Sequence, residues 1–83
     1  MVIFSGHALE KLVQRRIQKE LVESTVQDPD HVMPSYRGRQ TAYKKYGQKY
    51  LKVVFIQQGV NITVVTQHWD SKLNPAKIYE SKL

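Results

Sequence analysis

The hydrophobic residues change their spacing once along the chain, and this change limits the fold more than any other feature. Up to Gln27 they recur with the 3.6-residue period of amphipathic helices. The later segments are strand-like, and the alternation of apolar and polar residues is clearest from Lys49 to Trp69. Asp28-Pro29-Asp30 separates the two regions and ends a helix, because the residue before a proline avoids the helical conformation. Helices followed by a run of strands indicate an α+β fold rather than alternating βαβ units.

Two helices are predicted before the strands. Ser5 is a good N-cap for the first, which runs to about Arg15. This helix should stop there, because Arg16 would fall in the middle of its apolar face. We expect Ile17 to turn back as a core anchor and the second helix to cover about residues 19–27.

The rest of the chain predicts a twisted antiparallel sheet of three to five strands. We expect Gln58-Gly59 to form a tight hairpin turn, and His68 to continue the core-facing row of Val60, Ile62 and Val64 at the open end of the sheet. Strands are expected at residues 2–4, 31–36, 39–46, 49–56 and 60–69. Residues 71–83 have weak periodicity and form either a tail or a short extra element.

The chain is predicted to be a single cytoplasmic domain. Its 83 residues suffice for one domain, and it contains no cysteine for a disulfide, a thiolate metal site or a nucleophile. No apolar run approaches the roughly 20 residues that span a bilayer. The first four residues are too short for a secretory signal.

The positive charge of the chain is concentrated in its strand-like part. The net charge is +6, and residues 31–69 contain no Asp or Glu. A surface of one sign attracts phosphate backbones, so we expect RNA or another polyanion as a partner. The basic residues of this stretch are Arg37, Arg39, Lys44, Lys45, Lys49 and Lys52.

Two histidines could carry acid–base chemistry. His7 lies on the first helix, and Lys11 and Arg15 follow it on the same side, so the three form a basic stripe. His68 is the second candidate, at the rim of the sheet. Each could instead be structural, His7 as a surface residue and His68 as a half-buried one. No histidine spacing typical of a metal site is present, and we expect neither a metal nor a cofactor.

Tyr46 is the aromatic residue best suited to an RNA partner. It lies among Lys44, Lys45 and Lys49, and single-stranded RNA binders combine cations with aromatic rings on which bases stack. For Tyr43 and Tyr50 we favour a structural role as ordinary strand residues.

The N-terminal part resembles a prokaryotic domain family of unknown function. The family signature reads S-x-H-A, six residues, R-x-I, and a second helix that closes at D/N-P-D. Here it is matched by Ser5-Gly6-His7-Ala8, Arg15, Ile17 and Asp28-Pro29-Asp30, and the resemblance covers roughly residues 3–67. This family is usually placed with the RelE/ParE-like toxins of the barnase–colicin–RelE group.

The resemblance implies two helices packed on an antiparallel sheet, a metal-independent ribonuclease and an antitoxin as partner. His7 and Arg15 match the motif, whereas Lys11 stands where the family often has arginine. Arg16 replaces a glycine suited to a left-handed helix end, so that turn is either strained or different. Gln18 replaces a serine-type cap, which should weaken the second helix.

We therefore expect a toxin-type endoribonuclease that acts on RNA through the substrate's own 2′-hydroxyl. His7 or His68 serves as general base or acid, Arg15 with Arg37 or Arg39 stabilises the transition state, and Tyr46 positions a base. Lys11, Lys44 and Lys45 add to substrate binding. The alternative is a non-catalytic module of the same fold that binds nucleic acid or blocks a protein target. A third alternative is a protein whose tail, with Leu73, Ile78 and Tyr79, docks on another subunit. The oligomeric state stays open.

Overall fold

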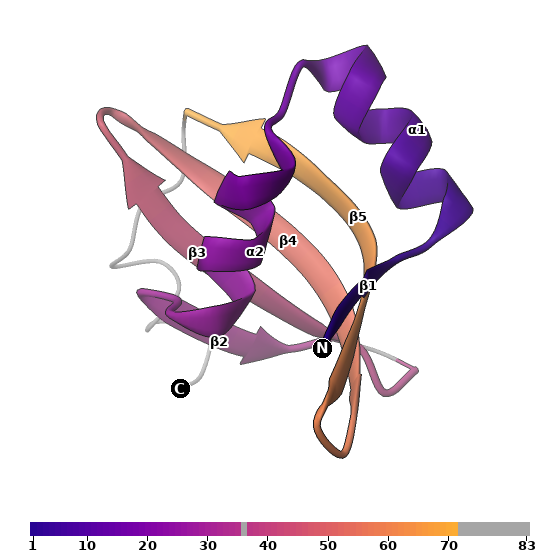
Figure 1. The fold of residues 1–83 in the computed structure, drawn as a ribbon. Coiled ribbons are helices and arrows are strands. Elements are labelled where there is room, and N and C mark those ends of the chain that lie inside the picture. Colours follow the sequence, from indigo (N-terminus) through magenta and orange to yellow (C-terminus); the bar gives the residue numbers. More distant parts are fainter. Residues whose placement is uncertain (36, 72–83) are drawn as a thin grey trace.

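The computed structural model describes residues 1–35 and 37–71, so the predicted tail lies outside the described residues from 72 onward. One short strand precedes two helices, and four strands follow (Figure 1). This order confirms the α+β prediction. The elements are β1 Val2–Phe4, α1 Gly6–Arg15, α2 Lys19–Gln27, β2 His31–Pro34, β3 Gln40–Tyr46, β4 Lys49–Gln58 and β5 Asn61–Asp70.

Helix α1 begins and ends where the sequence predicts. The Ser5 hydroxyl accepts a hydrogen bond of 3.0 Å from the Ala8 N–H. At the other end Arg16 adopts the left-handed conformation, with φ 53° and ψ 50°. Arg16 therefore forms the left-handed turn that usually has glycine at this position. The turn returns Ile17 to the core, where 5% of the Ile17 surface is exposed.

Helix α2 starts without a side-chain cap. Gln18 is its N-cap residue and makes no capping hydrogen bond, in keeping with the weak start that the sequence predicts. Val22 and Val26 bury its inner face, and the helix ends at Gln27 before Asp28-Pro29. Within residues 1–35 and 37–71, neither helix has the length and apolarity needed to cross a membrane.

The five strands form one mixed sheet in the order β1-β5-β4-β3-β2. Strands β2 to β5 run antiparallel, but β1 runs parallel to β5, with Val2 opposite Ile62. An all-antiparallel sheet was therefore the wrong expectation for β1. Alternation predicts a strand but not its direction, and β1 is fixed by the Ser5 N–H, which donates to the Val64 carbonyl at 3.0 Å.

Both helices pack on the same face of the sheet. Helix α2 lies across β3 and β4, and α1 lies along β5 and β1 (Figure 1). Gln67 ties α1 to β5, because its buried Nε2 donates to the Ala8 carbonyl at 2.9 Å. The buried core consists of Ala8, Ile17, Val22, Val26, Ala42, Leu51, Val53, Phe55 and Val64.

Candidate anion-binding site on the helix-free face

The sheet face opposite the core is called here the helix-free face. It carries the side chains that alternate with buried core residues such as Leu51 and Val53. The strand register sets these side chains in rows, because residues opposite one another share a face. Tyr43, Lys52 and His68 form one row, and Thr41, Val54 and Thr66 form the next.

A bulge in β5 decides which face His68 occupies. The register between β4 and β5 shifts so that Val65 is an extra residue on β5. Val64 and Gln67 flank the bulge and are both fully buried on the core side, because the extra residue reverses the alternation. His68 therefore lies on the helix-free face, and the prediction that it continues the core-facing row is wrong.

Arg15 reaches the same region from the end of α1. Its Nη1 donates to the Gln67 carbonyl at 2.8 Å and to Thr66 Oγ1 at 3.3 Å. This contact is accessible because β1 pairs only with residues 62–64 of β5. The guanidinium is thereby held beside the strand segment that carries His68.

The electrostatic surroundings keep His68 uncharged at neutral pH. Partial burial lowers its pKa below the ordinary 6.5, and the positive charges of Lys52 and Arg15 lower it further. The negative charge of Asp70 opposes these effects but is the smallest of the four. A neutral imidazole between two cations can accept a proton while the cations bind an anion.

Asp70 brings a carboxylate to the neighbouring row, where it lies opposite Tyr50. Burial raises the pKa of the Tyr43 hydroxyl, and the charge of Asp70 raises it further, so Tyr43 stays protonated at neutral pH. Among the described residues, no three His, Cys, Asp or Glu side chains gather in a way that could hold a metal ion.

A hollow of about 410 Å³ lies next to His68 on the helix-free face. Its lining among residues 1–35 and 37–71 includes two cations and three hydroxyls but no carboxylate. The Nε of Arg39 is buried there and has no hydrogen-bond partner among the described residues. Such a site suits a ligand rich in hydrogen-bond acceptors. The lining residues are Ser35, Arg39, Thr41, Lys52, Val54, Val65 and Thr66.

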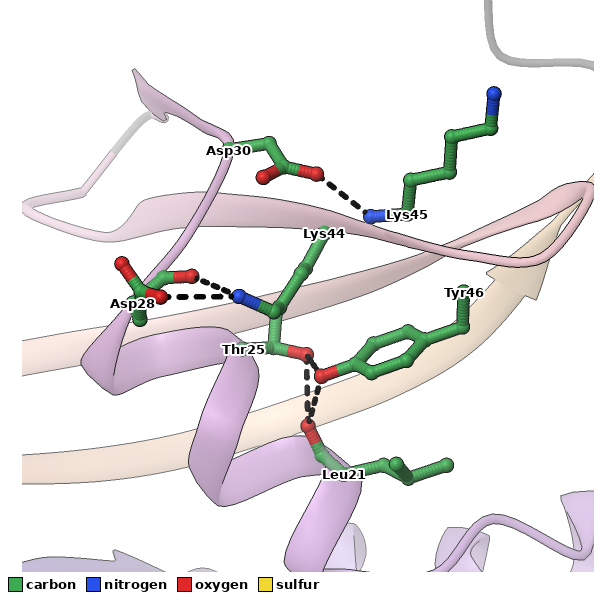
Figure 2. Close-up of polar contacts among 7 residues, drawn as sticks. All are labelled: Leu21, Thr25, Asp28, Asp30, Lys44, Lys45 and Tyr46. Carbon is green, nitrogen blue, oxygen red and sulfur yellow. Dashed lines mark hydrogen bonds and ion pairs between the residues drawn. The ribbon is translucent and has the colours of Figure 1, made fainter.

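Lys44 and Tyr46 lie on the other face, toward α2 (Figure 2). Lys44 Nζ binds the Asp28 carbonyl at 2.7 Å and the Asp28 carboxylate at 3.2 Å. The Tyr46 hydroxyl donates to the Leu21 carbonyl at 3.1 Å and lies 3.2 Å from Thr25 Oγ1. These contacts give both side chains a packing role, so we leave them out of the candidate site.

The remaining predicted residues surround the site without joining it. His7 is exposed, eight residues and about 12 Å along the helix axis from Arg15. Lys11 Nζ donates to the Gln14 side chain at 2.9 Å. Arg37 lies in the turn after β2, with φ 61°. Lys45 is exposed on the helix-free face, where it adds positive charge beyond the hollow.

Lys52 is the site residue that the sequence reasoning missed. It belongs to the basic stretch but had no role assigned to it. Its position between Leu51 and Val53 was the available signal, because a lysine that alternates with buried residues must lie on the opposite face. Its pairing with His68 depends on the bulge at Val65, which the alternation does not reveal.

The comparisons with known proteins identify a family. The family model described as "Domain of unknown function (DUF4258)" matches residues 4–78, which include both helices, strands β2 to β5 and the last residue of β1. Neither the comparison with curated proteins nor that with solved structures gave a match. The family description names no activity, so the function has to be inferred from the site.

Proposed function

The chain belongs to the family of the domain of unknown function DUF4258, and from this premise and the site we propose a RelE/ParE-like protein that binds RNA and cleaves it without a metal ion. RNA lies along the helix-free face, with the scissile phosphodiester beside His68. The observation that carries the proposal is the position of His68 between Arg15 and Lys52.

His68 is the proton acceptor of the proposed reaction. Its lowered pKa leaves the imidazole neutral at pH 7, so it can take the proton of the ribose 2′-hydroxyl as that oxygen attacks phosphorus. The bond between phosphorus and the 5′-oxygen breaks, and the departing 5′-oxygen takes a proton from water. The products are a 2′,3′-cyclic phosphate and a 5′-hydroxyl.

Arg15 and Lys52 supply the positive charge that the transition state needs. Negative charge grows on the non-bridging phosphate oxygens during attack, and fixed cationic donors stabilise it. The two hydrogen bonds of Arg15 use only Nη1, so Nε and Nη2 remain to bind phosphate. Lys52 is fixed opposite His68 by the strand register.

The test is cleavage of mixed RNA by the purified protein in EDTA. We expect His68→Ala to lower the cleavage rate by about 100-fold or more, which is the usual contribution of a general base. We expect a similar loss for Arg15→Ala. Lys49→Ala is the control, because it removes one positive charge at the exposed start of β4. The mechanism is wrong if His68→Ala and Arg15→Ala both cleave like the wild type.

A non-catalytic RNA-binding module is the second candidate, and the position of His7 favours it. The His7 side chain is exposed on the first turn of α1 and makes no hydrogen bond, ion pair or ring contact with other described residues. The site then has His68 alone for proton transfer. RNA affinity that falls steeply with salt, without cleavage in the same assay, would support the binding module.

A toxin role adds a protein partner to the proposal. The predicted partner is an acidic antitoxin, because the net charge is +6 and the helix-free face is cationic. A short neighbouring gene that encodes an acidic protein would support this role. A protein that binds such a partner but neither binds nor cleaves RNA would instead match the target-blocking alternative.

A further inference from the structure

We propose that the hollow on the helix-free face is a nucleobase subsite that prefers the keto bases guanine and uracil, with Arg39 as the residue that contacts the base. The inference rests on the proposed function, because it names the nucleotide that the same site accepts. It is carried by the size of the hollow, by its lining and by the Nε of Arg39, which has no hydrogen-bond partner within residues 1–35 and 37–71.

The hollow fits a base better than a phosphate. Its volume of about 410 Å³ lies in the range of small-molecule sites and far exceeds the space that one phosphate group fills. Val54 and Val65 contribute apolar surface, which suits the flat face of a ring. The phosphate-binding cation Arg15 stands outside the hollow, at the edge of β5.

Arg39 presents a buried donor that finds no acceptor in the part of the chain that the structure describes. The Ser35 N–H donates to the Arg39 carbonyl at 2.8 Å, which closes the turn between β2 and β3 and fixes the Arg39 backbone. Its Nε is buried and has no hydrogen-bond partner among the described residues. A buried donor that has lost water without gaining a partner is destabilising, and a base carbonyl would supply the missing acceptor.

The charged groups in the hollow favour keto over amino bases. Arg39 and Lys52 donate hydrogen bonds and cannot accept them, and no Asp or Glu of the described part of the chain lines the hollow. Guanine presents the O6 acceptor and uracil the O4 acceptor at the exocyclic position where adenine and cytosine present an amino donor, and guanine pairs O6 with N7, whereas adenine has N7 alone on that edge. The hydroxyls of Ser35 and Thr41 can donate or accept, so they do not discriminate.

The hollow and His68 are spaced for a single nucleotide. Thr66 lines the hollow and His68 follows two residues later on the same face, about 7 Å along the strand. Lys52 borders both. A base in the hollow therefore leaves its own phosphate beside His68 and Arg15.

The test is an NMR titration of the full chain with 3′-mononucleotides and with inorganic phosphate. We expect 3′-GMP and 3′-UMP to bind at least about tenfold more tightly than 3′-AMP and 3′-CMP, and to shift the Arg39 Nε–H signal. Arg39→Lys keeps the charge but removes Nε, so it should abolish the preference and keep phosphate binding. Arg16→Lys is the matched control, because it makes the same change at an exposed helix end.

A second variant tests the location. Val54→Phe fills the hollow with a good strand residue, so it should weaken 3′-GMP and 3′-UMP most and bring the four nucleotides to similar affinities, in a protein whose spectrum stays dispersed. Unchanged binding by Val54→Phe, or equal or absent binding of the four nucleotides by the wild type, overturns the subsite even if RNA is cleaved. Keto-selective binding by a protein that leaves RNA intact would support the subsite and overturn the cleavage.

Discussion

Arg16 holds a backbone conformation that favours glycine, with φ 53° and ψ 50°. In this region the Cβ lies too close to the following carbonyl oxygen, which costs roughly 1–2 kcal/mol. Core packing imposes this conformation on Arg16, because Ile17 must reach the core directly after α1 ends at Arg15.

We expect Arg16→Gly to raise the free energy of unfolding by about 1 kcal/mol, since glycine adopts this conformation without strain. Urea unfolding at pH 7 would measure the change. Gln14→Gly is the control, because it places the same residue on the exposed side inside α1, where it should lower stability by about 0.5–1 kcal/mol. A loss of stability in both variants would contradict the argument about strain.

His68 should make stability depend on pH in a defined window. Its pKa in the folded protein lies below the ordinary 6.5 expected in the unfolded chain. Between these two pKa values the unfolded chain binds more protons than the folded protein. Stability should therefore be greatest above about pH 6.5, fall as pH drops toward the folded pKa, and level off below it. His68→Gln should remove this part of the pH dependence, measured by urea unfolding between pH 4 and 8.

A change at Lys52 tests why the pKa of His68 is lowered. Lys52→Gln should raise the pKa of His68, because it removes the larger of the two repelling charges. NMR titration of the His68 ring measures the value in both proteins. A wild-type pKa at or above 6.5 would show that burial and the two cations do not dominate.

At the scale of elements, local chemistry made the helices predictable. Ser5, Arg15 and Asp28-Pro29 mark helix ends through caps and breakers that act within one turn, and the structure has these boundaries. The strands were also found, but the bulge at Val65 was not. A single extra residue leaves no mark on a local pattern and yet moves His68 to the other face.

The candidate site was harder to predict because it is assembled across elements. Lys52 meets His68 through the register of β4 and β5, and Arg15 arrives from α1. Tyr46 looked suited to stacking because lysines surround it in sequence. Its hydroxyl instead bonds to α2, a contact between elements that sequence neighbours cannot indicate.

Helix α2 offers a prediction at its own scale. Gln18 makes no capping hydrogen bond, so backbone N–H groups of the first turn lack the partner that a short hydroxyl side chain provides. We expect Gln18→Ser to stabilise the protein by about 1 kcal/mol, measured by urea unfolding. Gln27→Ser, at the C-terminal end of the same helix, should give no such gain. Equal effects at both positions would contradict a capping origin.

Across the whole molecule, the basic stretch divides between two faces. Alternation along β3 and β4 places Lys45 and Lys52 on the helix-free face and Lys44 and Lys49 on the other. Lys44 is paired with Asp28 at 3.2 Å. The net charge therefore overstates the positive charge of the helix-free face, which is concentrated around the hollow and His68.

The salt dependence of RNA affinity should show that only the basic residues on the helix-free face contact RNA. If Arg15, Lys45 and Lys52 each neutralise one phosphate of a single strand, while Arg39 contacts a base, the logarithm of affinity should fall with the logarithm of salt at a slope of about −2. Lys45→Ala should reduce the steepness by about 0.7, measured by fluorescence anisotropy with a single-stranded RNA. Lys49→Ala removes the same charge from the other face and should leave the slope unchanged. Equal changes in the two variants would mean that RNA senses the overall charge rather than the helix-free face.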